Sequence, residues 1–164
     1  MRTICLTLLI AAALAARAWG DESPTLRAAD AGVSPDFCPA LRALVDAAPG
    51  GFRAARRGGE RSWKASRRLP GASECLILDH VPPACVCTLY AGDVEEKTDG
   101  AYDRAVSGVK DCLPAGWKTT EKIDGVHTRT TSAAGGAGPS IRVVSRDATG
   151  DAYLVELWVD AARR

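Results

Sequence analysis

The stretch from Asp93 to Trp117, DVEEKTDGAYDRAVSGVKDCLPAGW, decides the fold. At about 100° per residue, its apolar and small side chains fall in one arc of a helical wheel, and most of its charged side chains fall outside that arc. The arc holds Val94, Thr98, Ala101, Tyr102, Ala105, Val109, Cys112 and Leu113. This spacing predicts an amphipathic helix that packs on a core and points Cys112 inward.

Both ends of this helix are marked in the sequence. Asp93 with Glu96 three residues later predicts a capping box, in which each side chain accepts a hydrogen bond from a backbone N–H at the helix start. Pro114 cannot continue the helix, and Gly116 can adopt the left-handed turn that lets Trp117 begin a strand. We therefore expect one helix followed closely by a strand.

The N-terminus has the pattern of a secretory signal. Met1 and Arg2 are followed by an apolar run from Ile4 to Ala16, and Ala18-Trp19-Gly20 places small residues where a signal peptidase cuts. The run is too short to span a bilayer comfortably, and no later run reaches the roughly 18 apolar residues that a membrane helix needs. We expect residues 1–20 to be a cleaved signal peptide, with no membrane span and a secreted or periplasmic protein.

The rest of the chain is expected to form a loose leader over residues 21–33 and a single domain over residues 34–164. Removing 20 of the 164 residues leaves 144, with 19 basic side chains against 20 acidic ones once Arg2 and Arg17 are gone. A net charge of −1 gives no reason to expect a nucleic-acid partner.

The remaining elements follow from periodicity and turn residues. Ser34-Pro35 predicts a helix start, and Pro49-Gly50-Gly51 predicts its end. Alternating or wholly apolar runs bounded by turn residues predict strands, and a Gly-rich loop is expected over Ser132 to Pro139. The first predicted strand begins at Ser62. The other six cover Glu74–Leu78, Cys85–Tyr90, Trp117–Ile123, Val126–Thr131, Ile141–Arg146 and Ala152–Asp160. This predicts an α+β fold, in the order α-β-β-β-α-β-β-β-β, with an antiparallel sheet of about six to seven strands and two helices packed on one face.

Three of the five mature cysteines, Cys75, Cys85 and Cys87, lie on a predicted hairpin, and its prolines set the register. Pairing Cys75 with Cys85 would push Pro82 into the ladder, where it has no N–H to donate, whereas pairing Cys75 with Cys87 keeps Pro82 and Pro83 in the loop. Directly opposed residues on neighbouring strands are close enough for a disulfide. We predict a bridge between Cys75 and Cys87.

The second predicted bridge joins Cys38 to Cys112, because both lie on the core sides of predicted helices. Cys85 is then unpaired and faces the sheet interior or a partner chain. Cys85 and Cys87 with His80 nearby could hold a metal, but zinc sites usually draw on two pairs of ligands, and cysteines of exported proteins are usually oxidised. We therefore expect no metal and no cofactor.

The segment from Arg53 to Arg68 carries a local charge of +6, with seven basic side chains against Glu60 alone. The seven are Arg53, Arg56, Arg57, Arg61, Lys64, Arg67 and Arg68. One interpretation is a solvated edge strand protected from aggregation by its charge, and the other is an anion-binding surface. The acidic row Glu95, Asp99 and Asp103 is likewise expected to face water.

Several short sequence motifs of this chain are similar to those of a group of exported proteins. Leu69-Pro70-Gly71-Ala72 with Cys75, the later Cys87, and Cys112-Leu113-Pro114 before Gly116-Trp117 resemble small exported bacterial proteins of uncharacterised function. Together with Trp63, these motifs are spread over about a third of the chain. The resemblance implies export and carries no activity to this chain.

Two classes of function remain open from the sequence. The first is an exported, disulfide-stabilised, non-enzymatic module that binds an envelope protein or an anionic surface polymer. The alternative is a small secreted hydrolase or thiol enzyme that uses Cys38 or Cys85 with His80 or His127. No Ser or Cys stands in a nucleophile motif, so we assign no catalytic residue and favour the binding module.

Overall fold

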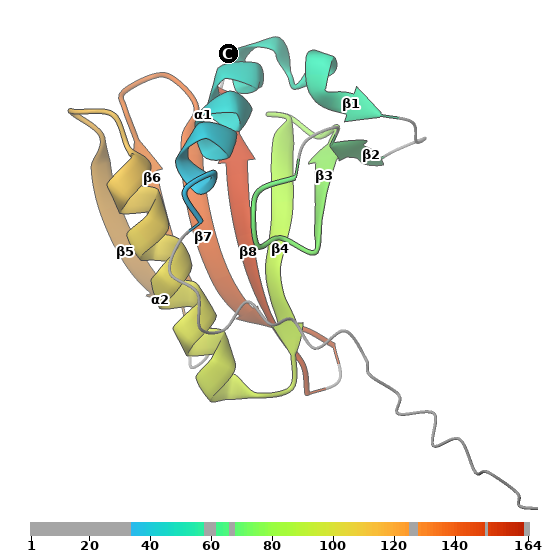
Figure 1. The fold of residues 1–164 in the computed structure, drawn as a ribbon, viewed down its shortest axis with the longest axis vertical. Coiled ribbons are helices and arrows are strands. Elements are labelled where there is room, and N and C mark those ends of the chain that lie inside the picture. The colour runs from blue at the N-terminus through green and yellow to red at the C-terminus, as the bar shows by residue number, and fades with distance from the viewer. Residues whose placement is uncertain (1–33, 58–61, 66–67, 125–127, 150, 163–164) are drawn as a thin grey trace, which may run out of the picture.

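The computed structural model describes residues 34–57, 62–65, 68–124, 128–149 and 151–162, and for residues 62–64 it describes the backbone alone. The predicted signal peptide 1–20 and leader 21–33 lie outside these ranges. In the described part of the chain, two helices cover one face of an antiparallel sheet (Figure 1). The predicted α+β class is confirmed.

The sheet has eight strands within the described ranges, in the order β1-β2-β3-β4-β8-β7-β6-β5. Every neighbouring pair is antiparallel. The strands are β1 Arg56–Arg57, β2 Ser62–Ala65, β3 Glu74–Leu78, β4 Ala84–Gly92, β5 Lys118–Asp124, β6 Thr128–Ala134, β7 Ser140–Asp147 and β8 Tyr153–Asp160. The prediction of six to seven strands missed β1, because two residues are too few to show an alternating pattern.

The helices are α1 Phe37–Ala47 and α2 Glu95–Cys112. Helix α2 packs over β4, β7 and β8, and α1 packs beside α2 (Figure 1). The middle of the predicted apolar arc is confirmed, but its N-terminal end is wrong, since Val94 is 38% exposed. The buried residues of α2 are Thr98, Tyr102, Ala105, Gly108, Val109 and Cys112.

The predicted capping box at the start of α2 is wrong. Val94 is the N-cap residue, and the helix start has no side-chain cap. Asp93 therefore lies one residue too early to cap the helix, and Glu96 is displaced with it. The carbonyl of Val94 accepts from both the backbone N–H and the hydroxyl of Thr98, at 3.1 and 3.0 Å, so Thr98 does not cap the N–H groups of the helix start.

The predicted loop over Ser132 to Pro139 is shorter than expected. Ser132 and Ala133 pair with Arg142 and Ile141, so β6 continues to Ala134. The small side chains of this stretch gave a loop signal, but cross-strand pairing overrides local propensity. The loop that remains, residues 135–139, lines one of the two cavities described below.

Side chains alternate between the two faces of the sheet. On the helix-covered face, Val155, Leu157 and Val159 of β8 are fully buried in one core with the inward residues of α1 and α2. The outward face has no helix among the described elements, and it carries polar and aromatic residues such as Arg142 and Trp158. Functional side chains can therefore gather on the outward face or at the ends of the strands.

Candidate functional site

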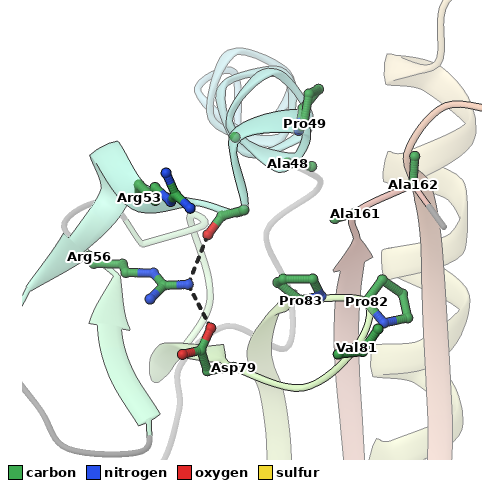
Figure 2. A pocket seen from close by; sticks show the side chains of 12 residues that line it. Ala48, Pro49, Arg53, Arg56, Asp79, Val81, Pro82, Pro83, Ala161 and Ala162 are labelled. Carbon is green, nitrogen blue, oxygen red and sulfur yellow. Dashed lines mark hydrogen bonds and ion pairs between the residues drawn. The ribbon is translucent and has the colours of Figure 1, made fainter. Parts of the chain in front are cut away.

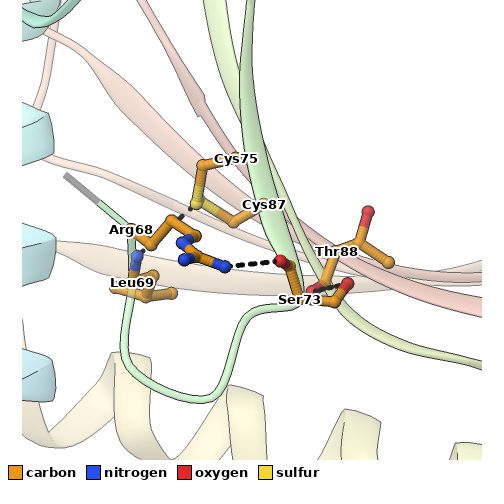
Figure 3. Close-up of a disulfide and its surroundings, with 6 residues drawn as sticks. All are labelled: Arg68, Leu69, Ser73, Cys75, Cys87 and Thr88. Carbon is orange, nitrogen blue, oxygen red and sulfur yellow. Dashed lines mark hydrogen bonds between the residues drawn. A yellow bond between two sulfur atoms is a disulfide. The ribbon is translucent and has the colours of Figure 1, made fainter. Parts of the chain in front are cut away.

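Two disulfides stabilise the described fold. Cys38–Cys112 joins α1 to the last residue of α2, with a Cα–Cα distance of 5.0 Å. Cys75–Cys87 joins β3 to β4, where the two residues are direct partners in the ladder. Figure 3 shows this bridge with the backbone N–H of Leu69, which donates to the sulfur of Cys75 at 3.5 Å. The structure thus joins the same pairs that helix faces and proline positions indicate in the sequence.

Neither candidate nucleophilic cysteine offers a reactive thiol. Cys38 is oxidised in its bridge to Cys112. Cys85 is the free cysteine of the described chain, but it is 0% exposed, and burial raises the pKa of its thiol from 9.0 to about 12. A reactive thiol needs exposure and a lowered pKa. Because Cys87 is also oxidised, the Cys85-Val86-Cys87 stretch does not present two thiolates to a metal.

Of the two candidate histidines, the structure describes His80 alone. His127 lies outside the described residues. His80 is exposed in the loop between β3 and β4, where its Nδ1 contacts the carbonyl oxygen of Pro82. Its ring is nearly parallel to that of Trp158, at 18° and 6.4 Å between centroids. Among the described residues, no serine or carboxylate hydrogen-bonds to His80.

A cleft of about 1060 Å³ lies where the end of α1 meets the β3–β4 loop and the residues that follow β8 (Figure 2). Small and proline residues form most of its wall. We call it the Arg53 cleft; its lining residues are Ala48, Pro49, Gly50, Gly51, Arg53, Arg56, Asp79, Val81, Pro82, Pro83, Ala161 and Ala162. Its volume is close to the upper end of the range for small-molecule sites.

Arg56 is a structural part of this cleft. Its Nη2 donates to the carbonyl oxygen of Gly51 at 3.1 Å and to Oδ1 of Asp79 at 2.8 Å (Figure 2). The side chain is 19% exposed, so the solvated-edge interpretation is wrong for Arg56. The arginine connects the turn after α1 to the start of the β3–β4 loop, and Asp79 balances its charge.

Arg53 lines the same cleft and differs from Arg56 in its contacts. It is exposed, and within the described ranges its guanidinium has no hydrogen bond or ion pair. It begins the short 3-10 helix η2, Arg53–Ala55, directly after Phe52. Phe52 is 0% exposed and has a left-handed backbone with φ of 59°, so a buried anchor holds the turn that presents Arg53.

The other predicted anion-binding residues do not converge on the cleft. Arg57 is exposed on β1, and Arg68 donates to the carbonyl oxygen of Ser73 at 3.0 Å (Figure 3). Arg61, Arg67 and the side chain of Lys64 lie outside the described structure. Sequence reasoning missed the apolar wall of the cleft, for which the consecutive prolines after Val81 were an available signal.

A second cavity, of about 570 Å³, shares Pro82 and Ala161 with the Arg53 cleft. We call it the His80 cavity; it is lined by His80, Pro82, Ala134, Gly136, Ala137, Gly138, Ser140, Arg142, Asp160 and Ala161. Sequence reasoning missed Arg142 and Asp160. Their proximity depends on the pairing of β7 with β8, which local patterns do not reveal.

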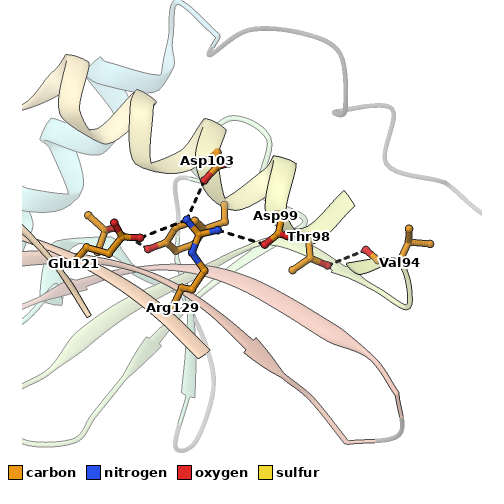
Figure 4. Close-up of polar contacts among 8 residues, drawn as sticks. Val94, Thr98, Asp99, Asp103, Glu121 and Arg129 are labelled. Atoms are coloured by element: carbon orange, nitrogen blue, oxygen red, sulfur yellow. Dashed lines mark hydrogen bonds and ion pairs between the residues drawn. The ribbon is translucent and has the colours of Figure 1, made fainter. Parts of the chain in front are cut away.

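The acidic row on α2 faces water, as the sequence indicated, because Glu95, Asp99 and Asp103 are all exposed. Asp99 and Asp103 each lie 3.4 Å from the guanidinium of Arg129 on β6, and Glu121 of β5 lies at the same distance (Figure 4). These carboxylates therefore help to hold α2 on the sheet. Asp99 and Asp103 make these ion pairs while their side chains stay 56% and 67% exposed.

Within the described ranges, no group of three or more His, Cys, Asp or Glu side chains is placed to hold a metal ion. None of the described helices is long and apolar enough to cross a membrane.

Comparison with known proteins gives no match to a protein family, to a curated protein or to a solved structure.

Proposed function

We propose that this protein is an exported, disulfide-stabilised, non-enzymatic binding module, and that its Arg53 cleft binds an acidic group of an anionic surface polymer. The observation that supports this proposal is Arg53 itself, a cation with no ion pair in the described structure, beside a largely apolar wall. The neighbouring cation, Arg56, is already neutralised by Asp79 at 2.8 Å. The cleft therefore has an excess of one positive charge.

The surroundings of Arg53 favour an acidic group that is attached to a less polar body. Pro49, Pro82 and Pro83 line the cleft, and Val81 on its rim is 99% exposed. Charge attraction is stronger beside apolar walls than in open water, because the local dielectric is lower. A sugar acid or a sulfated sugar combines such an acidic group with a body of moderate polarity.

Export is supported by the signal-like residues 1–20 and by the two disulfides of the described chain. Disulfides persist in the periplasm and outside the cell and are rare in the cytosol. We therefore propose that the protein acts in the periplasm or outside the cell. The alternative of a thiol enzyme lacks an accessible thiol among the described cysteines, so we do not propose it.

The test compares Arg53→Gln with Arg57→Gln, because both remove an exposed arginine but only Arg53 lines the cleft. Retention of the folded protein would be measured on a polyuronate matrix and on a sulfated polysaccharide matrix over a range of salt concentrations. We expect Arg53→Gln to lose salt-sensitive retention and Arg57→Gln to keep most of it. Equal retention of both variants and the unmodified protein would overturn the assignment of the cleft, and a specific complex with an envelope protein alone would overturn the choice of partner.

A further inference from the structure

The His80 cavity has a polar lining unlike that of the Arg53 cleft. His80, Ser140, Arg142 and Asp160 line it together with the loop of residues 135–139. They come from the β3–β4 loop, β7 and β8, which meet because β8 pairs with both β4 and β7. None of these four side chains lines the Arg53 cleft.

Arg142 is held rigidly in this cavity. Its Nε and Nη2 donate to the carboxylate of Asp160 at 2.7 and 2.9 Å, and its guanidinium carbon lies 4.8 Å from the centroid of the Trp158 ring. Bidentate pairing and ring contact fix both the position and the plane of a guanidinium. The Nη1 group has no hydrogen bond in the described structure and can donate to a ligand.

The paired charges of Arg142 and Asp160 favour neither an anionic nor a cationic ligand. The side chain of Asp160 is 12% exposed, and its carboxylate balances the charge of Arg142. For an anion the attraction of Arg142 is offset by the repulsion of Asp160, and for a cation the reverse holds, so the pair gives a charged ligand no net attraction. The cavity is therefore suited to an uncharged polar ligand.

His80 supplies an acceptor beside this donor. A carbonyl oxygen can only accept, so the Nδ1 atom that contacts the carbonyl of Pro82 carries the hydrogen. In the neutral ring this leaves the lone pair on Nε2, which can accept a hydrogen bond. The near-parallel contact with Trp158 helps to hold the ring in this orientation.

Ser140 and the adjoining loop complete the lining. The Ser140 hydroxyl can both donate and accept, and it has no hydrogen-bond partner in the described structure. Gly136 has a φ of +88°, and neither Gly136 nor Gly138 has an atom within 4 Å of the place where a Cβ would stand. The loop therefore leaves open space beside Ser140.

We propose that the His80 cavity is a binding site for an uncharged, polyhydroxylated ring, that is, a neutral sugar residue. Each sugar hydroxyl both donates and accepts, and the cavity offers a fixed donor at Arg142, an acceptor at His80 and a hydroxyl of both kinds at Ser140. Pro82, Ala134 and Ala161 provide apolar surface for the C–H groups of the ring. A volume of about 570 Å³ is typical of a small-molecule site.

The test uses neutral trisaccharides of glucose, mannose and N-acetylglucosamine as probes at millimolar concentration with the folded, disulfide-bonded protein. Backbone amide NMR shifts would locate binding, and titration would give Kd. We expect at least one probe to shift the amides of Gly136, Gly138 and Ser140. Ser140→Ala and His80→Phe should each weaken that binding by roughly threefold to tenfold, as expected for the loss of one hydrogen bond.

The controls separate this proposal from the one above. Ser107→Ala makes the same chemical change on the exposed side of α2 and should leave Kd unchanged, as should Arg53→Gln. His80→Phe keeps a ring beside Trp158, so weaker binding would reflect the lost acceptor. The proposal is overturned if no probe shifts the amides of Gly136, Gly138 and Ser140, or if the shifts map to another part of the protein. This result does not depend on how Arg53→Gln behaves on the acidic matrices.

Discussion

The guanidinium carbon of Arg129 lies 4.4 Å from the centroid of the Tyr102 ring, so a strand cation covers an aromatic ring of the packed helix. The hydroxyl of Tyr102 is buried and lies 2.7 Å from the hydroxyl of Thr131, which is two residues further along β6. The carboxylates of Asp99, Asp103 and Glu121 surround the same guanidinium (Figure 4). These contacts attach α2 to the half of the sheet that ends at β5.

Replacing Arg129 by Met should lower the free energy of unfolding by about 1 to 2 kcal/mol, because it removes the ring contact and leaves three carboxylates near one another. The Arg129 side chain is 31% exposed, so solvent limits the loss. Urea unfolding at low and high salt would measure it. Lys118→Met, on the exposed β5, is the matched control and should change stability little; an equal loss in both variants would contradict a specific role for Arg129.

The two disulfides should differ in their contribution to stability. Cys38–Cys112 has a sequence separation of 74 and Cys75–Cys87 a separation of 12. In the chain-entropy model, these loops correspond to about 4.4 and about 2.8 kcal/mol of stabilisation. We therefore expect the double variant Cys38→Ala/Cys112→Ala to unfold at lower urea concentration than Cys75→Ala/Cys87→Ala. The reverse order would show that native-state packing around the hairpin bridge outweighs loop closure.

Stability should fall in alkaline solution because of Cys85. Burial raises the pKa of its thiol from 9.0 to about 12 in the folded protein, so above pH 9 the unfolded chain loses this proton first and binds fewer protons than the folded chain. Below pH 9, Cys85 causes no loss of stability. Between pH 9 and pH 12, the free energy of unfolding should fall by about 1.4 kcal/mol for each pH unit, to a loss of at most about 4 kcal/mol. Burial also raises the pKa of Tyr102, which acts in the same direction.

Urea unfolding of the unmodified protein and of Cys85→Ala between pH 8 and pH 12 would measure this effect. The variant should be less stable at pH 8, because it leaves a small cavity, and its stability should fall less steeply with pH. Parallel pH curves for the two proteins would show that the Cys85 thiol does not hold its proton in the folded state.

The glycine loop beside the His80 cavity should tolerate change unevenly. A Cβ at Gly135 would lie 2.5 Å from Nε1 of the Trp117 ring, whereas a Cβ at Gly138 would meet no atom within 4 Å. We expect Gly135→Ala to lower the free energy of unfolding by roughly 1 to 3 kcal/mol and to displace Trp117, while Gly138→Ala has little effect. Tryptophan fluorescence and urea unfolding would compare the two. Equal stability of both variants would show that the Trp117 ring can move aside without cost.

The parts of the fold that depend on local spacing could be predicted from the sequence. The helical period around Tyr102 gave the buried face of α2, and the position of Pro82 gave the pairing of Cys75 with Cys87, because a proline has no N–H for the ladder. The ion pair of Arg56 with Asp79 joins residues 23 apart in the sequence, and no local pattern marks such a contact.

The same reason explains why the two cavities were missed. Arg142 and Asp160 come together through strand pairing, and the wall of the Arg53 cleft needs the end of α1, the β3–β4 loop and the chain after β8. The sequence did indicate the charge of Arg53 and the exposed loop at His80. It could not indicate that Pro82 lines both the Arg53 cleft and the His80 cavity.

The position of β8 has a consequence for the order in which the chain can fold. This strand is the last one in the sequence, yet it lies between β4 and β7 at the centre of the sheet. As the chain emerges N-terminus first, the hairpin of β3 with β4 and the hairpins of β5, β6 and β7 can form early, and α2 can pack on both parts. Their strands are hydrogen-bonded into one sheet only when Tyr153–Asp160 pairs with both β4 and β7. The sheet is therefore completed by long-range contacts that can form only after all of its other strands have been made, which slows folding.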